Sequence, residues 1–531
     1  MRQLAAEAMQ AWLAGEHERA ERLARAALAT QPNDPNALQV LGVACLRNDR
    51  VAEAVQHLRA AHDMTRDNPL VLNTLGVALR RAGDVSGARR AYARAGKLGS
   101  ADAWRNLGSL ERSENELDAA MAAFEKALAL QPESPAAHAG LAQLYELRHD
   151  LERAREHAER ALRLDPKNEL ALLALGQVLL RERDWMGVEA LLTPLGRDAK
   201  ATPVNRAIAI GLVGEALDRA GRVDAAFEAF TAANMLQRQL HAAALDAVES
   251  PFHPATVARL TRFLDREDVG AWTHPKSDRQ PAPVFLVGFP RSGTTLLDQI
   301  LSSHSGVVCL EEKEILAPIV ADLLSDEVLL TWRALPESTI RARRRLYWQR
   351  AETAARTPLG ARVLVDKLPL NLVLLPAIAR LFPDAKIIVA LRDPRDAVLS
   401  AYQQRFGMNA AMAQMLELQS AARYYDAAMT LWVRCREKLP LRFHEVRYER
   451  VVDDLEGAAR GLTTFLGLDF EPAMLEFAAT ARRRDITTPS ARQVIEPLYT
   501  RSVGRWRAYA PHLKPVLPVL AHWAARFGYP P

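Results

Sequence analysis

The first half of the chain repeats one pattern of apolar and small positions. The string LGVA contains Gly42 and occurs again at Gly76, 34 residues later. Two further columns, mostly alanine, follow this small position by 12 and 19 residues. A period of this length predicts pairs of antiparallel helices that stack into a solenoid, because small residues let the two helices of a unit approach closely. The small column continues at Gly108, Ala142, Gly176 and Gly214, and the alanine columns include Ala54, Ala88, Ala120, Ala61, Ala95 and Ala127.

These columns resemble tetratricopeptide repeats, and they predict six or seven units over residues 1–240. Pro32, Pro132 and Pro166 are expected to end their units, because proline cannot continue a helix. Stacked units of this kind form a groove that binds peptides or extended segments. Three roles for the array stay open: it holds a partner or substrate, it makes the protein a homodimer, or it braces the domain that follows.

The pattern changes after residue 240. Residues 241–283 lose the repeat and gain prolines, which predicts a linker with one short helix at residues 254–264. Residues 284–531 alternate apolar runs with long helical stretches, a rhythm typical of a parallel sheet covered by helices. The predicted fold is therefore an α-helical repeat solenoid followed by an α/β domain with a parallel sheet. Its strands are expected at residues 284–289, 363–366, 386–392 and 441–449.

Composition narrows the function class only a little. The 531 residues, of which 49% are hydrophobic and 25% charged, indicate a globular protein of several domains. A net charge of +5 is too dilute to favour nucleic acid as a partner. We expect no membrane span and, since the N-terminal residues lack a signal peptide, a cytoplasmic location. The three cysteines (Cys45, Cys309 and Cys435) lack zinc-site spacing.

The strongest chemical signal is the string VFLVGFPRSGTTLL, which begins at Val284. An apolar strand runs into a tight loop and then into a helix, whose first backbone N–H groups favour a bound anion. The string resembles a P-loop, but Thr294 follows Gly293 where a nucleotide triphosphatase has lysine. The missing lysine argues against a kinase acting on a small molecule.

The loop sequence is similar to the 5′-phosphosulfate loop of sulfotransferases, which move a sulfuryl group from 3′-phosphoadenosine 5′-phosphosulfate (PAPS) to an acceptor. The resemblance covers about residues 284–510. It implies a P-loop NTPase-like sulfotransferase fold, PAPS as donor, 3′,5′-ADP as product and no metal. The cofactor contacts that it implies in the loop are Arg291, Ser292, Gly293, Thr294 and Thr295.

A second family motif places Arg392 after a strand and Ser400 eight residues later. The resemblance implies that both hold the 3′-phosphate, a task that suits the planar fork of arginine. Tyr448 matches a tyrosine beside the adenosine. Ser490 matches a residue that stabilises the transition state, and Arg505 replaces a lysine in a C-terminal loop that closes over the cofactor.

The chain resembles tyrosylprotein sulfotransferases and bacterial sulfotransferases that carry tetratricopeptide repeats. Glu312 falls on the position of their catalytic base, which takes the proton of the acceptor hydroxyl. Lys367 matches a lysine that stabilises charge on the bridging oxygen of the donor. Glu314 and Pro318 stand where the tyrosylprotein enzymes have arginines, which argues against recognition of acidic peptides.

We interpret the sequence as that of a PAPS-dependent sulfotransferase that acts by in-line attack of an acceptor hydroxyl. Protein tyrosine, a saccharide, a lipid and a small molecule remain open as acceptors. The alternative from another class is a tetratricopeptide scaffold whose C-terminal domain binds a nucleotide without catalysis.

Overall fold

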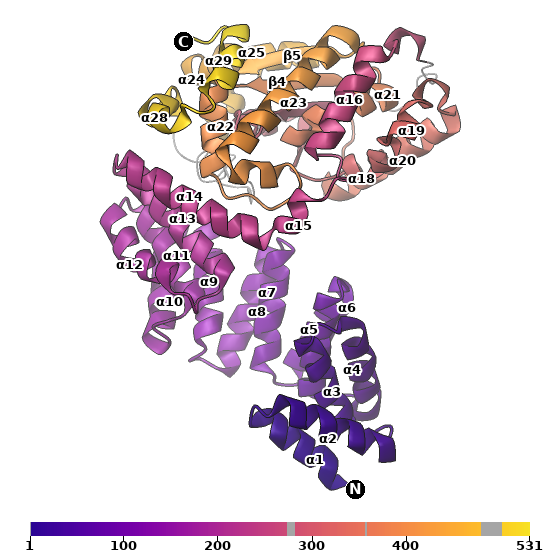
Figure 1. Ribbon diagram of the computed structural model, residues 1–531, viewed down its shortest axis with the longest axis vertical. Coiled ribbons are helices and arrows are strands. Elements are labelled where there is room, and N and C mark those ends of the chain that lie inside the picture. Colours follow the sequence, from indigo (N-terminus) through magenta and orange to yellow (C-terminus); the bar gives the residue numbers. More distant parts are fainter. Residues whose placement is uncertain (1, 273–281, 356–357, 479–501) are drawn as a thin grey trace. The chain divides into compact units, whose positions relative to one another are not determined.

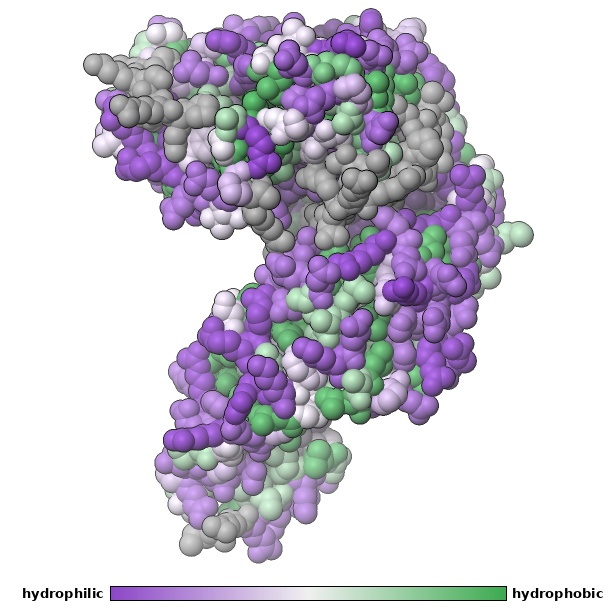
Figure 2. Space-filling model, turned by 180° about the vertical axis from the view of Figure 1, so that it is seen from behind, coloured by the Kyte–Doolittle hydropathy of each residue, from purple (hydrophilic) through white to green (hydrophobic). Residues whose placement is uncertain are grey.

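The computed structural model describes residues 2–272, 282–355, 358–478 and 502–531. They form two compact units, Met1–Ala201 and Thr202–Pro531, and Figure 1 labels their helices and strands. No helix of the described part of the chain combines the length and hydrophobicity needed to cross a bilayer. Hydrophilic residues predominate on the face shown in Figure 2, where hydrophobic residues lie in separate groups.

The first unit consists of six consecutive helix pairs, as the repeat period predicts. Pro32, Pro132 and Pro166 each lie two residues beyond the end of a helix, where we expected them. The twelve helices are α1 (Arg2–Leu13), α2 (His17–Thr30), α3 (Pro35–Arg47), α4 (Val51–Thr65), α5 (Pro69–Arg81), α6 (Val85–Lys97), α7 (Ala101–Ser113), α8 (Leu117–Leu130), α9 (Pro135–Leu147), α10 (Leu151–Leu164), α11 (Glu169–Arg181) and α12 (Trp185–Arg197). A seventh pair, α13 (Pro203–Arg219) and α14 (Val223–Leu240), belongs to the second unit.

The small column marks the crossing of the two helices in each pair. A Cβ added to Gly42 would lie 2.5 Å from Cγ of Leu58, and one added to Gly76 would lie 2.6 Å from the ring of Tyr92. The contacted side chain is sixteen residues further on in both pairs. Glycine therefore permits a close approach of the helices, which confirms the reason given for the period. The same relation holds for Gly108 with Phe124, Gly176 with Leu192 and Gly214 with Phe230.

Helix starts and turns repeat as regularly as the crossings. The side chains of Asp34, Asn68, Ser100, Ser134 and Asn168 each accept a hydrogen bond from a backbone N–H in the first turn of the helix that follows. The turn inside each pair contains one residue with positive φ, which lets the chain reverse within the three residues between the two helices. These turn residues are Gly15, Asp49, Gly83, Asn115, His149, Arg183 and Gly221.

The second unit contains a five-stranded sheet in which all neighbouring strands are parallel, which confirms the predicted fold class. The strand order is β2-β3-β1-β4-β5. Four strands lie where the sequence predicts them, but β2 was not predicted. The strands are β1 (Val284–Gly288), β2 (Val307–Glu311), β3 (Val363–Lys367), β4 (Lys386–Leu391) and β5 (Arg442–Arg447).

Helices cover both faces of this sheet (Figure 1). Leu286 of β1 belongs to a buried cluster that includes side chains of α17 (Thr294–Ser302) and α25 (Leu455–Leu466). The neighbouring Phe285 points to the other face, where its ring centroid lies 5.9 Å from that of Tyr347 in α20 (Glu337–Ala355). Trp432 of α23 (Leu418–Lys438) packs on Phe443 of β5. The parallel sheet is thus buried on both sides.

The remaining elements connect these layers. The helix predicted at residues 254–264 is present as α16 (Pro254–Arg266), and it packs against α23. The others are α15 (Ala242–Leu245), α18 (Ala317–Val320), α19 (Asp326–Leu329), α21 (Leu375–Leu381), α22 (Pro394–Gln403), α24 (Tyr448–Asp453), α28 (Ala510–Leu513) and α29 (Leu517–Arg526), with 3-10 helices η1 (Val269–Ala271), η2 (Ala321–Leu323), η3 (Trp332–Ala334), η4 (Pro369–Leu374), η5 (Met412–Leu416), η6 (Pro472–Glu476) and η8 (Arg505–Tyr509).

Candidate active site

The predicted site residues lie where parallel strands of the second unit end. Lys367 is the last residue of β3, while Glu312, Arg392 and Tyr448 directly follow β2, β4 and β5. The loop from Phe289 to Gly293 follows β1. Ligands of open α/β sheets bind at this carboxyl edge, so the strand order gathers the predicted residues at one edge.

The loop after β1 depends on two glycines. A Cβ on Gly288 would lie 2.6 Å from the carbonyl oxygen of Ala390 in β4, and one on Gly293 would lie 2.7 Å from Cδ2 of Tyr448. Gly293 also has φ +94°, a conformation that other residues adopt only at a cost. It precedes α17 and has no side chain to accept hydrogen bonds from the first turn. This helix N-terminus is therefore suited to an anion from outside the chain.

Two arginines meet beside this loop. Nε of Arg291 donates a hydrogen bond to Oγ of Ser400 in α22 at 3.1 Å, and Nη1 of Arg392 donates to the carbonyl oxygen of Arg291 at 3.0 Å. The guanidinium of Arg392 lies 5.0 Å from the ring centroid of Tyr448. Arg392 is 7% exposed, and within the described residues its Nε has no hydrogen-bond partner. A buried N–H donor without an acceptor lowers the stability of the fold unless a ligand accepts its hydrogen bond.

A carboxylate and a lysine form the second part of the site. The side chain of Lys367 is 0% exposed, and its Nζ lies 3.0 Å from Oε1 of Glu312 and 3.9 Å from Oε1 of Glu311. Glu311 stands opposite Lys367 in the β2–β3 register, and the backbone N–H of Glu312 donates to the carbonyl oxygen of Lys367 at 2.8 Å. The side chain of Glu312 is 31% exposed. The buried lysine is thus paired, while the glutamate keeps access to solvent.

Backbone strain falls on both parts of the site. Among the described residues of the second unit, Arg291 (φ +69°) and Glu312 (φ +46°) are the two non-glycine residues with positive φ. A non-glycine residue held in such a conformation costs roughly 1–3 kcal/mol, and strain of this kind clusters at functional sites. Both residues were predicted from sequence as site residues.

A buried carboxyl group lies next to Lys367 in the chain. Asp366 is 0% exposed, and its oxygens accept hydrogen bonds from Tyr347 at 3.0 Å and from Asn371 at 3.4 Å. Burial raises the pKa of Asp366 to about 7, against a small opposing effect of the tyrosine hydroxyl. Sequence reasoning missed this group. The available signal was a single carboxylate inside the apolar strand VLVDK.

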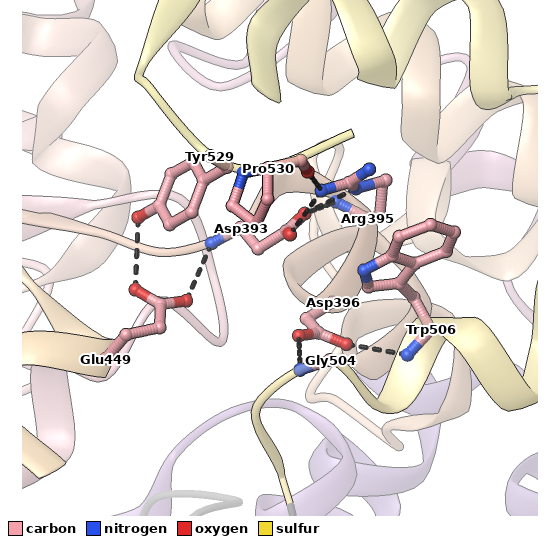
Figure 3. Close-up of polar contacts among 8 residues, drawn as sticks. All are labelled: Asp393, Arg395, Asp396, Glu449, Gly504, Trp506, Tyr529 and Pro530. Atoms are coloured by element: carbon pink, nitrogen blue, oxygen red, sulfur yellow. Dashed lines mark hydrogen bonds and ion pairs between the residues drawn. The ribbon is translucent and has the colours of Figure 1, made fainter. Parts of the chain in front are cut away.

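A network around the first residues after β4 was also missed (Figure 3). The Asp396 carboxylate accepts hydrogen bonds from the backbone N–H of Gly504 at 2.6 Å and of Trp506 at 2.7 Å. Burial raises the pKa of Asp396, although the charge of Arg392 and these two hydrogen bonds oppose the shift. The guanidinium of Arg395 lies 4.0 Å from the Trp506 ring centroid. The segment around Gly504 is therefore fixed to the loop that carries Arg392.

The same network holds the last residues of the chain (Figure 3). Glu449 accepts hydrogen bonds from the backbone N–H of Asp393 at 3.0 Å and from the hydroxyl of Tyr529 at 3.1 Å. Arg395 forms an ion pair with Asp393 and donates to the carbonyl oxygen of Pro530. The run of charges in LRDPRD was the available sequence signal, but its partners lie far along the chain.

Two known protein families match parts of this chain. A model described as the sulfotransferase family matches residues 283–472. The second unit carries a sulfotransferase-family domain. A tetratricopeptide repeat model matches residues 5–69, 73–135, 112–169 and 139–187, so the predicted combination of repeats and sulfotransferase domain is confirmed.

The relatives found by sequence include named sulfotransferases. The chain is 26% identical over 262 residues to protein-tyrosine sulfotransferase 2 of Gallus gallus. This match covers 47% of this chain and 69% of the relative. It is 28% identical over 330 residues to an uncharacterized protein of Aquifex aeolicus (strain VF5), a match that spans 59% of this chain and 41% of that protein. The solved sulfotransferase domain of the Synechococcus PCC 7002 olefin synthase is 22% identical, with a TM-score of 0.33 over 44% of this chain and 90% of that domain.

Of the predicted residues Ser490 and Arg505, the structure describes only Arg505. Ser490 lies outside the described residues. Nη2 of Arg505 donates to the carboxylate of Asp218 and, at 3.2 Å, to its carbonyl oxygen. Asp218 belongs to α13 of the seventh helix pair. The structure thus engages Arg505 with a helical repeat, a contact that the resemblance did not imply.

Potential metal ligands occur in the repeats. Within the described ranges, Cys45, Glu53 and His57 bring their ligand atoms within 4.8 Å of one another. Nη1 of Arg50 already donates to Oε2 of Glu53 at 3.0 Å. Burial raises the pKa of the Cys45 thiol and lowers that of His57. These three residues are poor ligands for a cation, because the Cys45 thiol is kept neutral and the Arg50 guanidinium already occupies Glu53.

Proposed function

We propose that this protein is a PAPS-dependent sulfotransferase that transfers a sulfuryl group to an acceptor hydroxyl. The buried Nε of Arg392, which has no partner within the described residues, carries the proposal. Arg392 bonds Arg291, which in turn bonds Ser400, in a region that matches the sulfotransferase family. PAPS supplies an activated sulfuryl group and a nucleotide phosphate that leaves with negative charge.

The residues around the β1 loop fit this donor. Arg392 uses one N–H on the Arg291 carbonyl and another on the Ser502 carbonyl, so its buried Nε and its remaining N–H groups suit the 3′-phosphate, with Ser400 beside them. Tyr448, which lies against both Arg392 and Gly293, would contact the adenosine. The 5′ side would be held by the helix N-terminus with Arg291, Ser292, Gly293, Thr294 and Thr295.

Glu312 and Lys367 fit the chemical step as a coupled pair. The partly exposed carboxylate of Glu312 would accept the proton of the acceptor hydroxyl as its oxygen attacks sulfur. Once protonated, Glu312 no longer neutralises the Lys367 ammonium 3.0 Å away. The lysine then stabilises the negative charge that develops on the leaving oxygen, with assistance from Arg291.

The acceptor carries a hydroxyl group that Glu312 can deprotonate. The relatives named protein-tyrosine sulfotransferases make a protein tyrosine the first acceptor to test, presented by a partner that the repeats hold. Glu314 and Pro318 offer no cation for acidic residues around such a tyrosine. A saccharide, a lipid or a small-molecule hydroxyl fits the same Glu312 chemistry. Ser490 keeps its proposed role in stabilising the transition state.

The test combines binding with transfer. Calorimetry should show that 3′,5′-ADP binds more tightly than 5′-AMP, which lacks the 3′-phosphate. Sulfate-labelled PAPS should then label an acceptor from a panel of tyrosine peptides, saccharides, lipids and phenols. Failure to bind 3′,5′-ADP would refute the proposal. Binding with no labelled acceptor in the panel or in a cell extract favours the scaffold, and Mg²⁺-dependent ATP turnover favours a kinase.

A further inference from the structure

The seventh helix pair packs on the sulfotransferase domain inside the second unit. The hydroxyls of Thr231 in α14 and Tyr402 in α22 lie 2.7 Å apart, and Nδ2 of Asn234 donates to the carbonyl oxygen of Tyr402 at 2.9 Å. Phe227 stacks on His512 with ring centroids 4.2 Å apart. Buried hydrogen bonds and stacked rings of this kind fix the two parts against each other.

Asp218 is the ionic contact in this packing that reaches toward the candidate site. Its carboxylate accepts hydrogen bonds from Nη2 of Arg505 and from the hydroxyl of Tyr509, and its carbonyl oxygen accepts a further bond from Arg505. The Asp218 side chain is only 19% exposed. One aspartate therefore holds both ends of η8 (Arg505–Tyr509).

The start of η8 and the residues before it are also bonded to the sulfotransferase domain. Nη2 of Arg392 donates to the carbonyl oxygen of Ser502 at 2.6 Å, and Asp396 accepts the backbone N–H groups of Gly504 and Trp506 (Figure 3). The segment from Ser502 to Trp506 is thus bonded to Asp218 through Arg505 and to Arg392 through Ser502. A shift of this segment would change the orientation of the Arg392 guanidinium, because the Ser502 carbonyl is one of its two hydrogen-bond acceptors.

We infer that Asp218 is a positioning residue for the nucleotide site. It anchors Arg505 and thereby the 502–506 segment, which keeps Arg392 in the orientation that receives a 3′-phosphate. The inference rests on the proposed function. It assigns the seventh helix pair to the donor site of the sulfotransferase, and it gives Arg505 an indirect role through Asp218 in place of a direct contact with the donor.

The test compares two aspartates of the same helix pair in the full-length protein. Asp218→Asn keeps the size of the side chain and removes the charge, and we expect it to weaken 3′,5′-ADP binding about tenfold by calorimetry. Binding of 5′-AMP should change less than twofold, because that ligand lacks the group that Arg392 receives. Asp224→Asn is the matched control. Asp224 pairs with His512 at 2.8 Å but is 88% exposed and does not contact η8, so its affinity should equal that of the wild type.

A second substitution separates positioning from general damage. In an Arg392→Ala background, Asp218→Asn should have no further effect on 3′,5′-ADP affinity, because the path through Arg392 is already broken. Arg505→Lys keeps the charge but loses the planar guanidinium, so it should weaken 3′,5′-ADP binding less than Asp218→Asn does. It replaces Asp218→Asn in the test if that variant does not fold. Equal weakening of 3′,5′-ADP and 5′-AMP, or wild-type affinity in Asp218→Asn, would overturn the inference. A wild-type protein that does not prefer 3′,5′-ADP refutes the proposed function instead.

Discussion

The β1–β4 side of the candidate site carries two arginines, Arg291 and Arg392, that contact each other. The hydrogen bonds of Arg392 go to the carbonyl oxygens of Arg291 and Ser502, and Nε of Arg291 donates to a serine hydroxyl. The nearby Asp396 uses its oxygens on backbone N–H groups. Arg392 therefore keeps N–H groups that can receive an anion, although its charge also acts on the Asp396 carboxylate.

On the β2–β3 side, the cation is already paired. Lys367 is fully buried against Glu312 and Glu311, and next to it in the chain lies the buried Asp366. In the proposed function, the charge of Lys367 becomes available to the donor only when Glu312 takes up a proton. In the proposed function, one edge of a single sheet would separate donor binding, which uses the arginines, from proton transfer, which uses the Glu312–Lys367 pair. Substitutions on the two sides should accordingly affect different measurements.

The largest expected effect is on turnover, from Glu312→Gln. The amide cannot accept the acceptor proton, so kcat should fall by about 10²- to 10⁴-fold, the usual contribution of a general base. The affinity for 3′,5′-ADP, measured by calorimetry, should stay within twofold of the wild type. Glu314→Gln is the matched control, since Glu314 is exposed two residues further on. A loss of nucleotide affinity in Glu312→Gln would contradict the separation of the two sides.

Arg392→Ala should show the opposite signature. Removing the charged donors from a phosphate should weaken 3′,5′-ADP binding by about 100-fold, which corresponds to roughly 3 kcal/mol. The affinity for 5′-AMP should change little and provides the internal control. Because Arg392 also bonds the carbonyls of Arg291 and Ser502, the thermal unfolding of the variant should be recorded with the binding. Equal loss for both nucleotides would place Arg392 outside the 3′-phosphate site.

A smaller effect is expected from Gly293→Ala. The new Cβ would sit 2.7 Å from the Tyr448 ring at φ +94°, and a non-glycine residue in this conformation costs about 1–2 kcal/mol. If the free protein relieves this strain by moving the loop, binding must restore the loop at a similar cost, so affinity for 3′,5′-ADP should fall about tenfold in a titration. Gly407→Ala is the control, because a Cβ there meets nothing within 4 Å and the backbone needs no positive φ. Unchanged affinity in Gly293→Ala would argue that the helix N-terminus does not hold the nucleotide.

The repeats and most of the sheet could be predicted because their signals are local and periodic. The glycine at each crossing contacts a side chain sixteen residues later, a spacing that the sequence repeats at Gly42, Gly76 and Gly108. Strand β2 was missed because its apolar run, VVCL, is short and is followed directly by four charged residues, EEKE. A fully apolar run such as that of β1 is easier to recognise.

The site was predicted only where a motif marks it. The two phosphate motifs supplied Arg291, Arg392 and Ser400, and the structure brings these three together. The contact of Asp218 with Arg505 joins residues 287 positions apart, and no motif marks Asp218. Only the tertiary packing brings α13, which carries Asp218, next to Arg505. Predicting such partners from one sequence would require the docking of the seventh helix pair to be known.

The smallest expected effect is on stability and depends on pH. Burial raises the pKa of Asp366 from 3.8 to about 7, so the folded protein binds a proton that the unfolded chain has released between these values. The stabilising contribution is thus complete below about pH 4 and is lost as the pH rises through about 7. Asp366→Asn has no proton to lose. In urea unfolding, the difference in stability between the wild type and Asp366→Asn should shift in favour of the variant from pH 5 to pH 8. A difference in stability that stays constant over this range would show that Asp366 is charged throughout. The β2–β3 side would then hold a permanent buried charge, as the β1–β4 side does, and not a carboxyl group that gains and loses a proton.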